Sequence, residues 1–331
     1  MTNHARTVLF HELGGPDVLK VEEVRLGAPG RGEARVRIDA IGVNRAEALF
    51  RAGTYYYQPT LPASRLGFEA AGTVEEVGAD VTDFVPGDLV SVVGDQEMSR
   101  HGVYADRVNV PARALLPRPA TMDAITGAAL WTTYLTAYGA LVEVGRTDPG
   151  DAVVITAASS AVGLAAIQIA NHLGAVPVAV TRTAAKAARL LQAGAAHVVA
   201  ADEGDVAGRV RALTGGKGAR TVFDAVGGSG LAELAQTVAD GGLLIVYGWL
   251  DARPAPLPMN WPLNIHGFAV DSVTADPARM ARARAFVEAG LRAGTLNPAI
   301  DRTFDLADIA EAHRHMESND QLGKIVVTVR H

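Results

Sequence analysis

The feature that most constrains the fold is a series of short apolar segments that alternate with helix-like segments between residues 152 and 247. The apolar segments are Ala152 to Thr156, Val176 to Val180, Val198 to Ala200, Thr221 to Phe223 and Leu243 to Tyr247. A strand that is apolar on both faces needs cover on both faces, which is typical of a parallel sheet between helices. This region therefore predicts a doubly wound α/β domain.

The residues on either side of this region have different patterns. From Thr7 to about Arg118, short strand-like segments are separated by turn signals such as the Pro-Gly-Asp of residues 86–88, which indicates a compact β-rich domain. Apolar residues at helical spacing then predict a helix from about Ala124 to Val144. After about Val273 two helices and a strand are expected. Periodicity alone does not decide whether this tail extends the parallel sheet or returns to the first domain.

Composition excludes several classes of function. At 331 residues the chain is long enough for two domains. It contains no cysteine, so disulfides, thiolate metal sites and a cysteine nucleophile are impossible. The net charge is -6 and the basic residues are scattered, which argues against nucleic acid as a partner. Residues 1–10 lack the pattern of a signal peptide, and no apolar run approaches the roughly 18 residues of a membrane span, so we expect a cytoplasmic protein.

The strongest site signal is the turn Ala-Ala-Ser-Ser-Ala-Val-Gly at residues 157–163, which follows a predicted strand and opens a helix. The first N–H groups of such a helix, with the positive end of its dipole, suit a pyrophosphate. Of the three glycines of the dinucleotide-binding pattern only Gly163 is present, and Ala158 and Ser160 occupy the other two positions. The strand and helix around the turn supply the context that the motif requires. The alternative is an ordinary helix start capped by Ser159 or Ser160.

The choice of dinucleotide depends on a second position, about 20 residues beyond the turn. Enzymes that use NAD place an acidic residue there to bind the ribose hydroxyls. In this chain the position is Arg182, between Thr181 and Thr183 and followed by Lys186. Two cations and two hydroxyls suit a 2′-phosphate, so NADPH is predicted. A pair of solvated charges at a helix start is the alternative.

Several further segments resemble the medium-chain dehydrogenases/reductases. Gly67-Phe68-Glu69-Ala70-Ala71-Gly72, together with the Pro-Gly-Asp of residues 86–88, is similar to the signature of that superfamily. Other blocks are similar to its zinc-independent quinone oxidoreductase (zeta-crystallin-like) branch, and they are Gly42-Val43-Asn44, Leu135-Thr136-Ala137-Tyr138, Ala157 to Gly163, Phe223 to Gly228 and Gly323-Lys324-Ile325-Val326. The blocks span nearly the whole chain in the order of the family.

The resemblance implies a fold of class α/β, with a GroES-like β-barrel catalytic domain interrupted by a Rossmann domain. We place the catalytic domain at residues 1–123 and 273–331, and the Rossmann NADPH-binding domain, a doubly wound parallel sheet, at residues 124–272. The resemblance also implies a homodimer paired through edge strands, for which Ile265 to Val270 is the candidate. Zinc-dependent relatives carry a histidine where this chain has Phe68, so no metal site is expected.

By resemblance, Asn44 would lie beside the nicotinamide, Tyr55 at the mouth of the substrate site, Thr136 under the cofactor and Lys186 at the 2′-phosphate. The rings of Tyr55 to Tyr57 could stack on a planar substrate, or form the edge of a hydrophobic lid with no chemistry. Asn44 and Tyr55 are therefore the predicted catalytic residues. The predicted cofactor-binding residues are Thr136, Ala158, Ser159, Ser160, Val162, Gly163, Thr181, Arg182, Lys186 and Gly248.

The predicted activity is transfer of hydride from NADPH to a quinone or to the β-carbon of an α,β-unsaturated carbonyl. The partner is thus a small molecule, with no role for nucleic acid or a membrane. An enoyl thioester reductase of a biosynthetic pathway would use the same chemistry. A protein that binds NADPH without turnover is the alternative from another class.

Overall fold

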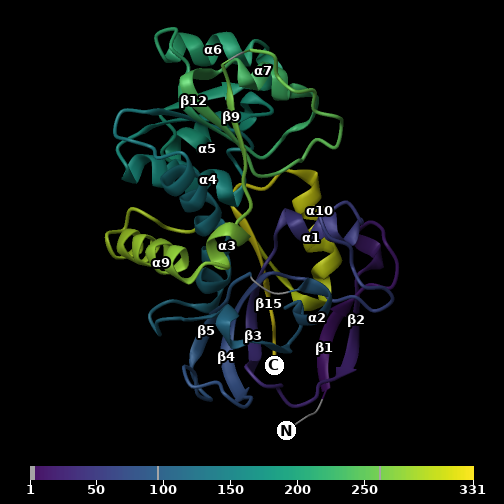
Figure 1. The fold of residues 1–331 in the computed structure, drawn as a ribbon. Helices are drawn as coiled ribbons and strands as arrows, with labels where there is room; N and C mark the ends of the chain where they lie inside the picture. The colour runs from purple at the N-terminus through teal and green to yellow at the C-terminus, as the bar shows by residue number, and fades with distance from the viewer. Residues whose placement is uncertain (1–3, 95–96, 261) are drawn as a thin grey trace. The chain divides into compact units, whose positions relative to one another are not determined.

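The computed structural model describes residues 4–94, 97–260 and 262–331, and these divide into two compact units. The first unit contains the described residues up to Thr132 together with Ile300–His331, and the second is Thr133–Ala299. Figure 1 shows the chain coloured from its N-terminus to its C-terminus. The expected α/β class is confirmed, because one unit is rich in strands and the other is built on a parallel sheet.

The first unit is built around a seven-stranded sheet. Along this sheet the strands follow the order β14-β15-β3-β4-β5-β7, and β6 pairs with β3. The bounds are β3 Glu33–Gly42, β4 Glu69–Val77, β5 Leu89–Val92, β6 Arg107–Pro111, β7 Leu115–Pro117, β14 Ile300–Asp305 and β15 Lys324–Thr328. A separate antiparallel pair consists of β1 His4–Leu9 and β2 Lys20–Arg25. Since β15 pairs with β3, the C-terminal segment returns to the first unit, as the resemblance implied.

Three helices accompany this sheet, and they are α1 Arg45–Arg51, α2 Met98–His101 and α10 Ile309–Ser318. The core of the unit lies where the apolar faces of the strands meet α1 and α10, and it includes Val36, Ile38, Phe50, Leu66, Val108, Ile309 and Val327. At Gly72, in β4, a Cβ atom would lie 2.0 Å from the carbonyl oxygen of Arg37 on the neighbouring strand. The close approach of these two backbones therefore requires glycine at this position.

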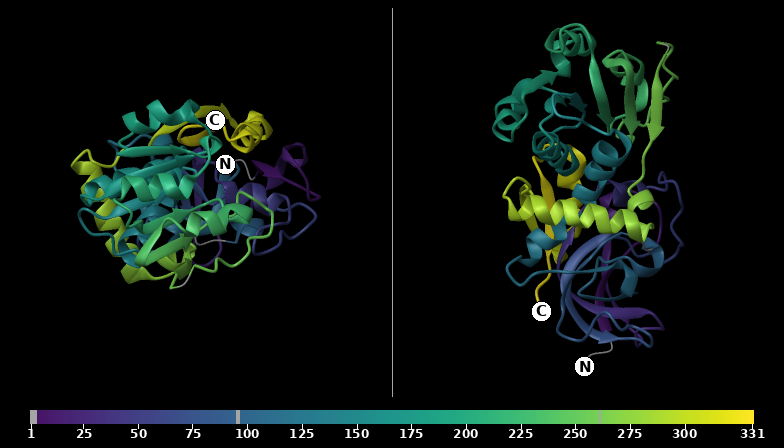
Figure 2. Two further views of the ribbon diagram at one scale, coloured as in Figure 1. Left: turned by 90° about the horizontal axis from the view of Figure 1, so that it is seen from above. Right: turned by 60° about the vertical axis from the view of Figure 1, so that its left-hand side comes forward.

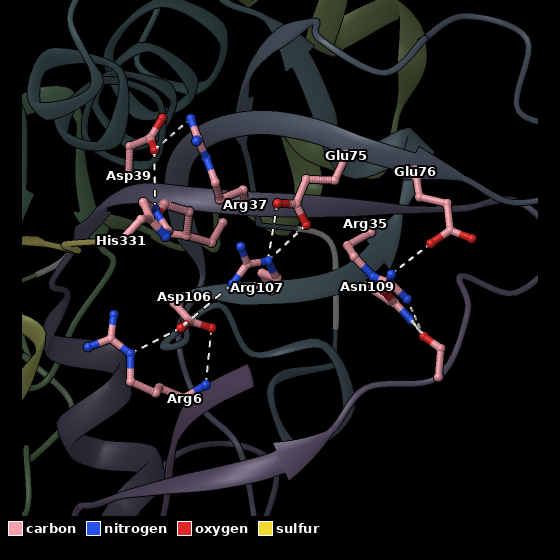
Figure 3. Close-up of polar contacts among 12 residues, drawn as sticks. Arg6, Arg35, Arg37, Asp39, Glu75, Glu76, Asp106, Arg107, Asn109 and His331 are labelled. Atoms are coloured by element: carbon pink, nitrogen blue, oxygen red, sulfur yellow. Dashed lines mark hydrogen bonds and ion pairs between the residues drawn. The ribbon is translucent and has the colours of Figure 1, made fainter. Parts of the chain in front are cut away.

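Ion pairs join charged side chains of the first unit (Figure 3). They join Arg6 to Asp106, Arg107 to Glu75, Arg35 to Glu76, and Asp39 to both Arg37 and His331. His331 Nε2 also bonds the carbonyl oxygen of Ile38 at 2.9 Å. Partly exposed pairs contribute on the order of 0–1 kcal/mol each, so each of these pairs adds little to the stability of the unit.

The second unit contains a six-stranded, fully parallel sheet in the order β10-β9-β8-β11-β12-β13. The strands are β8 Ala152–Ile155, β9 Val176–Thr181, β10 His197–Ala200, β11 Ala219–Asp224, β12 Val238–Val246 and β13 Asn264–Gly267. The connecting helices are α4 Ala161–His172, α5 Ala187–Gln192, α6 Val206–Leu213 and α7 Leu231–Ala235. The strand order reverses between β8 and β11, and ligands of such sheets bind at the carboxyl ends of the strands next to this point.

The second unit extends further along the chain than the domain boundary expected after residue 272. Helix α8, Asp271–Thr274, and helix α9, Pro277–Arg292, both belong to this unit. Phe286 of α9 packs on Tyr138, with ring centroids 5.1 Å apart, and Arg279 pairs with Glu143 at 2.7 Å. These side-chain contacts keep α9, the yellow-green helix in the right-hand view of Figure 2, with the second unit.

The helix expected from Ala124 to Val144 consists of two parts. Helix α3, Ala124–Tyr138, is followed directly by a π-helical turn, Gly139–Val144.

Within the described residues, no helix combines the length and the apolar composition that crossing a bilayer would need.

Candidate functional site

The turn between β8 and α4 has the geometry of a dinucleotide-binding loop. Ala157 adopts a left-handed conformation with φ of 44°, which few residues other than glycine adopt. Ser160 caps α4 by accepting the N–H of Gly163 at 3.1 Å. A Cβ atom at Gly163 would lie 2.7 Å from both the Ala157 carbonyl oxygen and the Ala158 Cα. The one glycine retained from the motif is therefore the one at which the helix packs against its own turn.

The predicted cations follow the neighbouring strand. Thr181 is the last residue of β9, Arg182 is exposed, and Lys186 ends the short 3₁₀ turn Ala184–Lys186. Lys186 Nζ donates to Ser159 Oγ at 3.2 Å. The structure thus brings two predicted cofactor residues together from two separate loops. The charge of Lys186 lies beside the turn, where the helix N-terminus already favours an anion.

The remaining predicted cofactor residues occupy separate positions in the same unit. Thr136 is buried in α3, Val162 lies in the first turn of α4, and Gly248 follows β12. A Cβ atom at Gly248 would lie 2.9 Å from the carbonyl oxygen of Ala225, at the end of β11. Thr136, Val162 and Gly248 remain predictions as cofactor contacts.

Sequence reasoning missed a buried aspartate at the same edge of the sheet. Asp224, the last residue of β11, is 1% exposed. It accepts the hydroxyl of Thr156 at 2.6 Å and the N–H groups of Val226 and Gly227 at 3.1 and 2.8 Å. Asp224 therefore holds the loops after β8 and β11 together. The available signal was an acidic residue at the end of an otherwise apolar strand.

Tyr247 is a second missed residue of this edge. Its ring stacks on Phe223 with centroids 4.0 Å apart, and burial raises the pKa of its hydroxyl well above the usual range, a shift that a hydrogen bond with Ser160 partly offsets. Tyr247 thus connects the strand core to the residue that caps α4.

In the first unit, Asn44 lies inside a network of charged side chains. It follows β3 and precedes α1 in an extended conformation. Its Nδ2 atom donates to the Gly42 carbonyl oxygen and to Glu47 Oε1, both at 3.2 Å, and its Oδ1 atom accepts from Lys324 Nζ at 2.7 Å. Lys324 Nζ also donates to Glu69 Oε1. The side chains of Lys324 and Glu69 are 3% and 1% exposed, so this ion pair is buried.

Glu47 extends the network toward α10. Besides the amide of Asn44, it accepts the N–H groups of Asn44 and Phe68 at 2.5 and 3.0 Å and the hydroxyl of Tyr104 at 2.8 Å. Complete burial raises the pKa of Glu47 to about 7, against the opposing effect of these donors and of Lys324. Near neutral pH the protonated and the ionised form of Glu47 are therefore both populated.

His313 ends this hydrogen-bond chain, with Nε2 at 3.2 Å from the Tyr104 hydroxyl. Burial, with the nearby charges of Arg51 and Arg45, lowers the pKa of His313 to about 3. The ring is therefore neutral. With Glu47 ionised, Tyr104 donates its proton to Glu47, so the hydrogen bond to Tyr104 must be donated by Nε2 of His313.

Tyr55 belongs to an aromatic cluster of the same unit. It is half-buried, and its ring centroid lies 6.4 Å from that of Phe50, 5.1 Å from that of Tyr57 and 6.2 Å from that of Phe68. Phe68 also donates its N–H to Glu47, so it connects the aromatic cluster to the Asn44 network. Tyr55 is thus linked to Asn44 through two residues, Phe68 and Glu47.

No group of three or more His, Asp or Glu side chains that could hold a metal ion occurs among the residues the structure describes.

Comparisons with known proteins match both units. Residues 30–120 match the family model described as an alcohol dehydrogenase GroES-like domain, and residues 161–286 match the one described as a zinc-binding dehydrogenase. The chain is 32% identical to a 2-haloacrylate reductase of Burkholderia sp, over 96% of this chain and 97% of that protein. It is 30% identical to a quinone oxidoreductase of Pongo abelii, with 97% of each chain covered. The crystal structure of the Escherichia coli quinone oxidoreductase complexed with NADPH superposes with a TM-score of 0.91 at 28% identity, covering 98% of this chain and 99% of that one.

Proposed function

We propose that this chain, which belongs to the medium-chain dehydrogenase/reductase superfamily and within it to the quinone oxidoreductase branch, is an NADPH-dependent reductase of conjugated acceptors. The acceptor is a quinone or the β-carbon of an α,β-unsaturated carbonyl. The named relatives reduce acceptors of these kinds, a quinone in one case and a 2-haloacrylate in the other. A quinone and a 2-haloacrylate both contain a carbon–carbon double bond conjugated with a carbonyl or carboxylate group.

The observation that carries the cofactor assignment is the contact between Lys186 and Ser159. It places a cation beside a helix N-terminus, and Arg182 follows the neighbouring strand where NAD enzymes carry an acidic residue. This donor set fits the pyrophosphate and the 2′-phosphate of NADPH, the cofactor with which the Escherichia coli relative was crystallised. Bound NADPH supplies the hydride. The residues at the turn provide binding energy for its phosphates.

For Asn44, the observed bonding favours one of two roles. Both Nδ2 hydrogens have acceptors within the chain, on Gly42 and Glu47. The Oδ1 atom accepts from Lys324, and an amide oxygen can accept two hydrogen bonds. Asn44 is therefore suited to accept the N–H of the nicotinamide carboxamide and so to fix the face from which hydride leaves. Donation to the oxygen of the acceptor would require Nδ2 to give up one of its present bonds.

For Tyr55, the packing supports an aromatic wall. Phe50, Tyr57 and Phe68 hold its ring from several sides, so the ring can position a planar acceptor without a loss of its own rotamer freedom on binding. After hydride transfer, the hydroquinone or enolate oxygen can take its proton from water. Tyr55 is then not needed as a proton donor.

We also propose that two copies pair through β13. All four residues of this edge strand, Ile265 among them, are exposed in the single chain, and the preceding segment of the sequence exposes further large apolar side chains, namely Trp249, Leu250, Leu257 and Met259. An open strand edge beside apolar side chains favours pairing with another strand.

The decisive experiment measures NADPH oxidation by the purified protein with a quinone, an enal, a 2-haloacrylate and an enoyl thioester. Faster turnover of a quinone or an unsaturated carbonyl than of the thioester supports the proposal. Preference for the thioester would assign the enzyme to biosynthesis instead. Tight NADPH binding without oxidation by any of these acceptors would make the chain a binding protein and refute the proposed activity.

A further inference from the structure

The ammonium group of Lys324 is fixed in place by the way two strands meet. Lys324 is the first residue of β15, which pairs with β3 so that Val326 lies opposite Gly42. The N–H of Val43 then bonds the carbonyl oxygen of Ile325 at 3.0 Å, just before the chain reaches Asn44. The Lys324 side chain is 3% exposed. The pairing of the two strands therefore fixes the position of the ammonium group relative to Asn44, and burial limits the motion of the side chain.

Glu69 is the counter-charge of this buried lysine. It begins β4, where it lies opposite Gly42 of β3, and it bonds Lys324 through Oε1 and the N–H of Thr132 through Oε2, the latter at 3.0 Å. A buried ion pair is a poor source of stability, since well-packed apolar residues of similar volume often serve as well or better. The ion pair instead affects Asn44, because the ammonium group of Lys324 bonds the Asn44 side chain.

The partners of Asn44 select one orientation of its amide. An amide can rotate by half a turn and exchange its oxygen with its nitrogen at little steric cost. On one side Lys324 can only donate, which requires Oδ1 to face it. On the other side Glu47 Oε1 and the Gly42 carbonyl oxygen face the Nδ2 hydrogens. Only one orientation of the amide satisfies the donor and both acceptors, and in it Oδ1 faces the ammonium group.

We propose that Lys324 is a positioning residue for hydride transfer, which holds the Asn44 amide in the orientation that accepts the nicotinamide carboxamide, with Glu69 as its counter-ion. The inference rests on the proposed function, since it needs NADPH as the hydride donor. Lys324 acts through Asn44 and does not touch the acceptor. Loss of the lysine lets the amide rotate, and the nicotinamide is then less often in the reactive geometry.

The test replaces both charges together. Lys324→Met alone would leave Glu69 buried without a counter-charge and could prevent folding, so the variant is Lys324→Met with Glu69→Gln. A matched control removes another cation–carboxylate pair from β3 and β4, Arg35→Met with Glu76→Gln, whose nitrogen and oxygen lie 2.7 Å apart and whose carboxylate is exposed. Lys324→Arg, which keeps the charge, serves as the conservative variant.

The measurement is the single-turnover rate of hydride transfer from bound NADPH to a quinone, checked by its deuterium isotope effect, beside the Kd for NADPH. We expect the Lys324/Glu69 variant to transfer hydride at least about tenfold more slowly, with the Kd changed by less than about threefold. The Arg35/Glu76 control should stay within about twofold of the wild type, and Lys324→Arg should retain part of the rate. Adding Asn44→Ala to the Lys324/Glu69 variant should bring hydride transfer to within about twofold of the rate of Asn44→Ala alone, because both changes act on the same contact.

Two results would overturn the inference while leaving the proposed function intact. One is a wild-type rate in the Lys324/Glu69 variant. The other is a loss in the triple variant equal to the product of the separate losses, which would show that Lys324 does not act through Asn44. An inactive wild type with every acceptor would instead refute the proposed function, and this inference with it.

Discussion

In the first unit the charged side chains around Asn44 are buried and bonded to one another, whereas in the second unit the cations beside the dinucleotide turn lie nearer the surface. Glu47, Glu69 and Lys324 are nearly or fully enclosed. Arg182 is exposed and Lys186 is half-buried. Enclosed charges fix geometry, because each is held by several partners. An exposed cation stays hydrated while no ligand is bound, so it attracts a phosphate group without the desolvation cost that a buried charge carries. We therefore assign the orientation of the nicotinamide to the first unit and the choice between NADPH and NADH to the second.

The largest expected effect concerns the buried carboxyl group of the first unit. Since burial raises the pKa of Glu47 from 4.5 to about 7, its protonated form is favoured in the folded state. The contribution of Glu47 to stability is then fully present below about pH 4.5 and is lost as the pH rises through about 7, by up to roughly 3 kcal/mol. Urea unfolding at pH 5 and pH 8 should show the wild type losing stability relative to Glu47→Gln as the pH rises. A difference between the two proteins that does not change with pH would show that Glu47 titrates normally.

The next effect concerns Asn44 itself. Asn44→Ala should lower turnover about 100-fold, because a reacting group misplaced by about 1 Å can cost that much. The Kd for NADPH should change far less, since the phosphates are expected to bind at residues 159–186 of the second unit. Unchanged turnover together with a collapse of NADPH affinity would make Asn44 a cofactor-binding or structural residue and would remove the distinction between the two units.

A smaller effect is expected from the cations of the second unit. Arg182→Asp should weaken NADPH binding by about tenfold or more while improving NADH binding, because a charge-assisted contact contributes about 1.5–3 kcal/mol. Arg189→Asp, an exposed arginine of α5 in the same unit, is the matched control for net charge. An equal loss of NADPH affinity in both variants would mean that binding depends on the net charge of the unit and not on a contact of Arg182.

The smallest effect is expected from the hydroxyl of Tyr55. Tyr55→Phe should retain turnover within about threefold of the wild type, because the ring is the part that packs against Phe50 and Phe68. Steady-state kinetics with a quinone measures this directly. A loss of 100-fold or more, on the order expected for a lost general acid, would make the hydroxyl a proton donor.

Local sequence signals predicted most of the second unit but little of the network in the first. The alternation of apolar strands and helices predicted the parallel sheet, and the position of Gly163 predicted the turn before α4. The return of the last strand to the first unit came from the resemblance, because strand pairing between residues near 42 and 326 leaves no local signal. The bond between Glu69 and Lys324 joins residues 255 positions apart, and periodicity carries no information at that separation. The assignment of α9 to the second unit likewise depends on single side chains such as Phe286.

We propose that the chain transfers hydride from NADPH, which it selects through the 2′-phosphate. The most direct test measures the Kd for NADPH and for NADH on the same preparation, followed by consumption of each with a quinone. We expect NADPH to bind at least about tenfold more tightly, in keeping with one charge-assisted contact or more to the phosphate, and to be oxidised when the quinone is added. Equal binding of the two dinucleotides, or bound NADPH that no quinone or unsaturated carbonyl oxidises, would contradict the account.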